Sequence, residues 1–98
     1  MTLSTHVLDT ARGTPRAGTV VQLLDAAGAV VAEATTDDDG RAVLLAGEVP
    51  PGTHRLRFDV AGPFFPEVVV TVAVAEPTAR LHVPLLLSPF GYTTYRGS

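Results

Sequence analysis

Three histidines and one arginine are the residues of this sequence best suited to chemistry near neutral pH. The histidines are His6, His54 and His82, and Arg41 follows the acidic run at residues 37–39. An imidazole takes up or releases a proton near neutral pH, so two of them in one site are candidates for acid–base catalysis. An arginine in the same site would bind an anion or a developing oxyanion through its planar, permanently charged group.

Each of these residues also has a structural interpretation. His54 lies in line with the apolar residues of a strand predicted at residues 53–60, and is interpreted as a packed or partly exposed histidine. By position alone, His6 and His82 are also more often structural than functional, and most arginines beside acidic residues face solvent. Position therefore makes two histidines and the arginine candidates without deciding between the two interpretations.

The acidic run and the histidines do not form a metal-binding motif. If Gly40 were the sixth residue of an EF-hand loop, Thr35 and Ala46 would stand at the first and twelfth positions, and neither is a suitable calcium ligand there. No two histidines have the close spacing that is common in zinc sites, so zinc stays a minor alternative. We therefore expect no metal site.

The strand predicted around His82 indicates where a site would lie. Alternate positions are apolar and define a core face: Leu81, Val83, Leu85 and Leu87. The remaining positions define a second face: Arg80, His82, Pro84 and Leu86. A histidine among apolar neighbours is unusual on a face left in water. We therefore predict that another copy of the chain covers the second face.

Length and composition narrow the class of protein. The 98 residues predict a single domain, and 46% hydrophobic against 17% charged residues makes disorder improbable. A net charge of −3 without a basic cluster argues against nucleic acid as a partner. There is no cysteine, the amino terminus lacks the features of a signal peptide, and no apolar run is long enough to span a membrane. These features predict a cytoplasmic protein without a membrane partner.

Short valine-rich segments, separated by eight prolines and nine glycines, predict an all-β fold. About eight short antiparallel strands are expected, at residues 3–10, 19–24, 29–36, 41–45, 53–60, 67–75, 80–87 and 92–96. The second and third of these are joined by a turn at residues 25–28 and should pair as a hairpin. Strands of this number and spacing are typical of a β-sandwich.

Four blocks of the sequence resemble the transthyretin-related 5-hydroxyisourate hydrolases. They are LSTHVLDTARGTPRAG at residues 3–18, TDDDGR at 36–41, FFPEV at 64–68 and HVPLLLSPFGYTTYRGS at 82–98. The resemblance runs essentially from end to end of residues 1–98. The terminal YRGS is its most specific part, because the hormone-carrying transthyretins differ there.

The resemblance implies both a fold and an activity. The fold would be a transthyretin-like, two-sheet antiparallel β-sandwich that assembles as a homotetramer with two-fold symmetry. The activity would be the hydrolytic opening of 5-hydroxyisourate to 2-oxo-4-hydroxy-4-carboxy-5-ureidoimidazoline in urate catabolism, without a metal or organic cofactor. Relatives place a longer connection with a short helix before FFPEV. Here only residues 59–63 separate Phe58 from Phe64, so we expect no helix.

By resemblance, His6, Arg41 and His82 are the catalytic residues, and they bind substrate together with Ser98. We expect the site to lie at a subunit interface. His6 is assigned as the base that takes a proton from water, and His82 as the residue that orients the water or returns a proton. The reverse assignment stays open, because two interacting histidines titrate as a pair.

The remaining candidates keep structural roles. His54 is expected to be structural, and Tyr95 and Arg96 to fix the end of the last strand, with Arg96 pairing with a carboxylate. Two other functions compete with the hydrolase. One is a non-catalytic carrier of a small ligand, which the YRGS end and the two histidines disfavour. The other is a structural module of a larger protein, which the start and stop of the chain disfavour.

Overall fold

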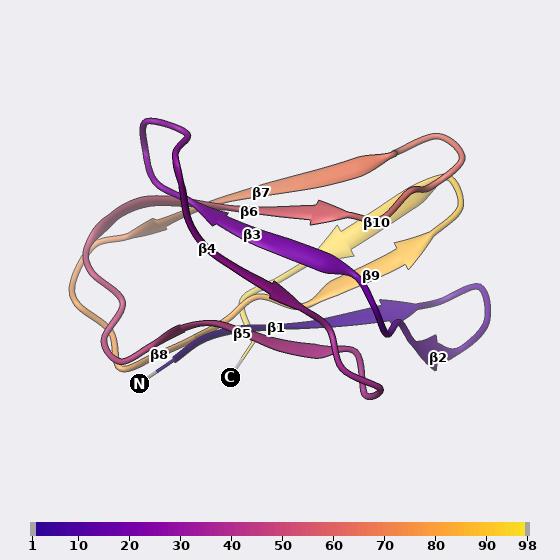
Figure 1. The fold of residues 1–98 in the computed structure, drawn as a ribbon, viewed down its shortest axis with the longest axis horizontal. Helices are drawn as coiled ribbons and strands as arrows, with labels where there is room; N and C mark the ends of the chain where they lie inside the picture. Colours follow the sequence, from indigo (N-terminus) through magenta and orange to yellow (C-terminus); the bar gives the residue numbers. More distant parts are fainter. Residues whose placement is uncertain (1, 98) are drawn as a thin grey trace.

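The computed structural model describes residues 2–97, apart from the side chain of Thr2, and contains ten strands and no helix in that range. The strands are β1 (Thr2–Asp9), β2 (Thr14–Pro15), β3 (Val20–Leu24), β4 (Val30–Thr35), β5 (Arg41–Ala46), β6 (Gly52–Asp59), β7 (Glu67–Val74), β8 (Arg80–His82), β9 (Leu85–Ser88) and β10 (Gly91–Thr94). They form two sheets that face each other across a common core (Figure 1). The predicted all-β sandwich and the predicted loss of the helix are both confirmed. With no helix in the described range, the structure shows no helical segment able to cross a bilayer.

The larger sheet has six strands and is organised around β1. Along one edge β1 pairs with β5 and then with the two-residue β2, and along the other it pairs with β8 and then β9. β10 pairs with β9 and forms the outer edge. The pairs of β1 with β8 and β9 are parallel, whereas all other described strand pairs are antiparallel. The prediction of antiparallel strands is therefore correct except for the neighbours of β1 on this side.

The smaller sheet has four strands in the order β4-β3-β6-β7. β3 and β4 pair as the predicted hairpin. Its turn is stabilised by Asp25, whose carboxylate oxygen Oδ1 accepts hydrogen bonds from the amides of Ala27 and Ala29, both at 2.9 Å. Aspartate is favoured at turns because its side chain can accept such hydrogen bonds from nearby main-chain amides.

The core lies between the two sheets and is built from alternate residues of their strands. The residues predicted to form the core face of the His82 strand are all buried: Leu81, Val83, Leu85 and Leu87. On the opposite sheet Leu56 and Phe58 are fully buried beside the half-buried His54. The ring nitrogen Nε2 of His54 donates to the carbonyl oxygen of Pro50 at 2.8 Å, which supports the structural role predicted for this histidine.

The strand predicted at residues 80–87 is interrupted at Val83 and Pro84. Proline has no amide hydrogen to give to a ladder, and the carbonyl oxygen of Pro84 accepts instead from the Thr94 hydroxyl at 2.7 Å. Pro84 is also buried rather than open on the second face. The last strand correspondingly ends at Thr94, opposite Leu85, and not at residue 96 as predicted.

The connection between β6 and β7 is short and tightly held. Ala61 adopts a positive φ of 48°, and its amide donates to the carbonyl oxygen of Pro66 at 2.9 Å. The guanidinium of Arg16 donates to the carbonyl oxygen of Val60. These bonds close residues 60–66 into a compact turn where the relatives are expected to carry a helix.

Candidate active site

β1 places two polar residues on the outer face of the larger sheet. Leu3, Thr5 and Val7 are fully buried, so the alternating Ser4 and His6 face away from the core. The register then decides their neighbours. His6 lies opposite Arg41 on β5, and Ser4 lies opposite His82 on β8. Three adjacent strands therefore bring His6, Arg41 and His82 onto one face.

A cavity of about 310 Å³ opens on this face. Its lining consists of Ser4, Thr5, Arg41, Ala42, Val43, Arg80 and His82. The only charged side chains of the lining are the two guanidiniums. Among residues 2–97, neither guanidinium makes a hydrogen bond or an ion pair, because the one ion pair of this range joins Arg57 to Glu67. Within the part of the chain that the structure describes, the cavity therefore offers two unpaired guanidiniums to an anionic ligand.

His82 is held in the neutral form at the edge of this cavity. Burial lowers its pKa below the ordinary value of 6.5, and the charges of Arg41 and His6 lower it further. A hydrogen bond with the main chain of Ser4 raises the pKa and partly offsets these effects. The ring nitrogen Nδ1 lies 2.9 Å from the Ser4 hydroxyl oxygen. A neutral imidazole with one nitrogen engaged and one free is able to accept a proton or orient a water molecule.

His6 is oriented by the acidic turn that precedes β5. Its Nε2–H donates to the main-chain carbonyl oxygen of Asp39 at 2.8 Å. A carbonyl oxygen only accepts, so this bond assigns the hydrogen of a neutral His6 to Nε2 and leaves the lone pair on Nδ1. Asp39 of the acidic run therefore contributes its main-chain carbonyl group to the orientation of His6.

Asp37 shapes that turn. Its carboxylate oxygen Oδ1 accepts from the amides of Asp39 at 2.9 Å and Arg41 at 3.0 Å. Gly40 completes the turn with a φ of 76°, and its carbonyl oxygen accepts from the Val7 amide at 2.7 Å. The turn thus ties β5 to β1 next to both His6 and Arg41.

Not every predicted site residue falls within the described part of the chain. Ser98 lies outside the described residues, but the neighbouring Gly97 pairs with His82. The ion pair predicted for Arg96 is not present among residues 2–97. No three histidine or carboxylate side chains in this range are grouped so that they could hold a metal ion.

The sequence analysis placed Arg80 on the same face as His82 without naming it as a site residue, and it did not single out Ser4. Arg80 shares the outer face with His82, so strand alternation alone was sufficient to place it there. Ser4 carries no such signal, because its contact with His82 joins residues 78 positions apart in the chain.

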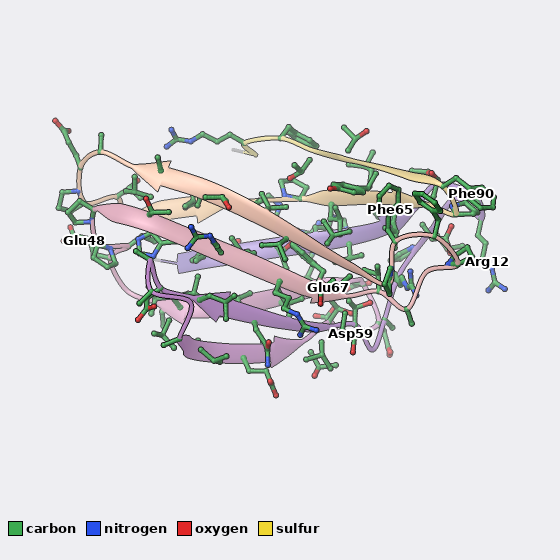
Figure 2. The ribbon with its side chains drawn as sticks, turned by 90° about the horizontal axis from the view of Figure 1, so that it is seen from above. Arg12, Glu48, Asp59, Phe65, Glu67 and Phe90 are labelled. Carbon is green, nitrogen blue, oxygen red and sulfur yellow. The ribbon has the colours of Figure 1, made fainter. Side chains whose placement is uncertain are left out.

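A larger cavity of about 520 Å³ lies beyond the carboxyl end of β1. Arg12, Arg16 and Phe65 are among its lining residues, and it contains no histidine. Figure 2 shows Arg12, Phe65 and Phe90 together at this end of the sandwich, with Glu48 at the opposite end. Of these two cavities, the smaller one is lined by a histidine, so size is not the criterion that identifies the site.

Comparison with known proteins identifies the family of this chain. The family model described as HIUase/Transthyretin family matches residues 3–97. A 5-hydroxyisourate hydrolase from Caulobacter vibrioides is 43% identical over 112 aligned positions, which cover 98% of this chain and 97% of the relative. Because 112 exceeds the 98 residues of this chain, the relative carries residues that this chain lacks.

Two solved structures have the same fold. The 5-hydroxyisourate hydrolase of Klebsiella pneumoniae is 32% identical, with a TM-score of 0.89 and 100% coverage of both chains. Sea bream transthyretin in complex with thyroxine is 28% identical, with a TM-score of 0.87 and coverage of 99% of this chain and 95% of that chain. On these grounds the chain belongs to the HIUase/Transthyretin family.

Proposed function

We infer that this protein hydrolyses 5-hydroxyisourate to 2-oxo-4-hydroxy-4-carboxy-5-ureidoimidazoline in urate catabolism. The observation that carries this inference is that His6, Arg41 and His82 lie on one face of three neighbouring strands, with His6 opposite Arg41 and His82 opposite Ser4. Relatives over essentially the whole chain bear the name of this hydrolase, which supports the same reaction. A proton-accepting pair beside an unpaired guanidinium is the chemistry that opening a cyclic amide requires.

The reaction is a hydrolysis in which one bond to nitrogen breaks. A water oxygen attacks the ring carbonyl carbon, and the carbon–nitrogen bond of the cyclic amide breaks. The carbon keeps the water oxygen and becomes the carboxyl group, while the nitrogen takes up a proton and becomes part of the ureido group. His6 is proposed as the base, because its Nδ1 lone pair is free when Nε2 binds Asp39. His82 is proposed to orient the water or to return the proton to nitrogen.

Arg41 is proposed to bind the oxygens of the substrate. A urate derivative is a small, planar and readily ionised ring, and a guanidinium binds such oxygens in pairs. Arg41 has no competing partner among the described residues, so binding an anion would not require breaking an ion pair. Ser98 is proposed as a further substrate-binding residue, because its neighbour Gly97 pairs with His82.

We propose further that the protein is a homotetramer with active sites at a subunit interface. Support comes from the outer face of the larger sheet, where Val43 is 55% exposed next to the cavity. The half-buried Leu8 and Leu86, which are partners in the pair of β1 and β9, alternate with core residues on the same sheet. Apolar side chains around a polar site favour cover by a second protein surface.

A single domain spanning residues 1–98, a cytoplasmic location and catalysis without metal or organic cofactor complete the proposal. The cofactor part is tested by dialysing the protein against a chelator and comparing turnover before and after. Unchanged turnover is expected. A loss that returns on adding one metal would contradict this part.

A non-catalytic carrier is the second candidate function. The observation that favours it is the match to a transthyretin solved with thyroxine. A carrier has no need of two histidines and an unpaired guanidinium on one face, so we place the hydrolase first.

The two candidates are separated by one assay. The ultraviolet absorbance of freshly made 5-hydroxyisourate is followed with and without protein, with spontaneous decay as the baseline. A hydrolase accelerates the decay in proportion to its concentration. Decay at the baseline rate, together with calorimetric binding of thyroxine, would favour the carrier.

A further inference from the structure

The backbone of Gly97 lies directly against the imidazole of His82. The two residues form an isolated antiparallel bridge, in which the Gly97 amide donates to the His82 carbonyl oxygen at 2.8 Å. A Cβ atom placed on Gly97 would stand only 2.5 Å from Cδ2 of the ring and 3.2 Å from Cγ. Any larger residue at position 97 would therefore displace the ring.

Ser4 holds the same imidazole from another direction. Its hydroxyl oxygen lies 2.9 Å from Nδ1, and the two residues are partners in the parallel pair of β1 and β8. Cδ2, which contacts Gly97, is bonded to the other ring nitrogen, Nε2. Both contacts together leave Nε2 as the one ring nitrogen without a hydrogen-bond partner among residues 2–97.

The strand pairing holds the backbone of His82 more firmly than its ring. His82 is the last residue of the three-residue β8, and the amide of the next residue, Val83, still donates to the carbonyl oxygen of Ser4 at 2.9 Å. A side chain at a strand end gains little restraint from neighbouring pairs. Catalytic geometry tolerates little looseness, because a shift of about 1 Å costs on the order of 100-fold in rate.

We propose that Gly97 and Ser4 are positioning residues that hold the His82 imidazole with Nε2 directed to the substrate. This proposal rests on the hydrolase function inferred above and deepens it. Gly97 acts through shape, by leaving room for the ring, and Ser4 acts through its hydroxyl group. Neither residue is assigned a proton-transfer step.

The first test replaces Gly97 by alanine. We expect kcat for 5-hydroxyisourate to fall by about 100-fold while KM changes little, because the displaced ring still allows Arg41 to bind the substrate. Gly91→Ala is the matched control, since a Cβ there meets only the Ser88 hydroxyl at 3.4 Å, an ordinary contact. Wild-type kcat in Gly97→Ala would overturn the proposal.

A second variant separates positioning from a general loss of structure. In a His82→Ala background, adding Gly97→Ala should cause no further loss of rate, because the ring it displaces is gone. An equal further loss in that background would show that Gly97 acts in another way.

Ser4 is tested by hydroxyl removal and rescue. Ser4→Ala should lower kcat by about 10-fold, and Ser4→Thr, which keeps a hydroxyl group, should restore most of it. If Ser4→Ala and Ser4→Thr have the same kcat, the hydroxyl group does not position the ring and Ser4 is removed from the proposal.

A readout independent of activity distinguishes this proposal from the proposed function. The ring-proton NMR signals of His82 should change in position and titration in Gly97→Ala, but not in Gly91→Ala. If the wild-type protein does not accelerate 5-hydroxyisourate decay, the proposed function fails while the NMR comparison still decides the positioning. Unchanged His82 signals would overturn the positioning even in an active enzyme.

Discussion

His82 combines a lowered pKa with a hydrogen bond to Ser4, and this has a consequence for the pH dependence of activity. Its pKa is lowered first by burial and then by the charges of Arg41 and His6. The neutral form therefore persists below the ordinary value of 6.5. If catalysis requires a neutral His82 ring, the lowered pKa extends the active range to lower pH than an ordinary histidine would allow.

We predict that, if His82 must be neutral, the acidic limb of kcat/KM for the free enzyme lies below pH 6.5. The lowered pKa of His82 also makes the free energy of unfolding depend on pH. The unfolded chain binds the His82 proton more tightly than the folded chain, so this histidine lowers stability as pH falls through 6.5 toward the folded-state pKa. A pH–rate profile measures the pKa that governs kcat/KM, and an NMR titration measures the pKa of His82 in the folded protein. Arg41→Gln should raise the NMR value, and an unchanged or lower value would contradict the assigned cause.

Removing either proposed catalytic histidine should abolish most of the activity without unfolding the protein. His6→Ala and His82→Ala are each expected to lower kcat/KM by roughly 10²–10⁴-fold, the usual contribution of a positioned acid or base. His54→Ala is the control, because His54 lies on the smaller sheet and its ring binds the main-chain carbonyl of Pro50. Circular dichroism checks the fold. Unchanged turnover in a variant would remove that histidine from the site.

The sequence predicted the candidate site only through its resemblance to a family. Strand alternation placed His82 on a second face, but it did not show that Ser4, two residues before His6, would contact it. That contact depends on which strands are neighbours and in which register, and neither property is encoded in a local pattern. The contribution of Gly97 depends on the same pairing and was missed for the same reason.

At the scale of single elements, the turn before β5 is the most constrained part of the site. Gly40 has a φ of 76°, and a Cβ there would lie 2.4 Å from the Val7 carbonyl oxygen. The clash is with backbone, which cannot move aside without disturbing β1. The turn therefore requires glycine for two independent reasons.

We predict that Gly40→Ala destabilises the protein by about 3 kcal/mol or more, the sum of left-handed strain and a backbone clash. Gly18→Ala is a matched control, because Gly18 has the same φ of 76° but open space around it. It should cost only about 1 kcal/mol. Urea denaturation measures both values, and equal losses would show that the clash is relieved at no cost.

Strand positions were predicted well, and strand continuity less well. The predicted core-face positions at residues 80–87 all stay buried through the interruption, including Val83, which is not part of a strand, but Pro84 on the predicted second face is buried as well. Hydrophobic patterning reports the burial of side chains and not the pairing of the backbone. The parallel pairs of β1 were not predicted, because no hairpin or crossover signal joins segments so far apart in the chain.

At the scale of the whole molecule, charge is distributed unevenly. The net charge is −3, yet the candidate site contains two guanidiniums without partners among the described residues. A local positive field within an acidic protein attracts small anions without promoting nucleic-acid binding. This distribution agrees with the proposal that the ligand is an ionised ring.

The proposed tetramer can be tested by substituting two valines whose side chains are equally exposed in the single chain. Val43 on β5 and Val31 on β4 are each 55% exposed, but only Val43 lies beside the site. We predict that Val43→Asn weakens the tetramer, because it places an amide in an apolar interface, whereas Val31→Asn leaves assembly unchanged. Light scattering across a dilution series measures the mass. A fully active wild-type monomer would contradict the interface site.

The parallel pairing of β1 with β8 also has a kinetic consequence. The hydrogen bond between Ser4 and His82 spans 78 residues, so almost the whole chain must be organised before it can form. Closing long loops is entropically costly, and contacts of such separation slow folding. During refolding from denaturant, turnover should therefore return with the slowest kinetic phase, later than the β3–β4 hairpin.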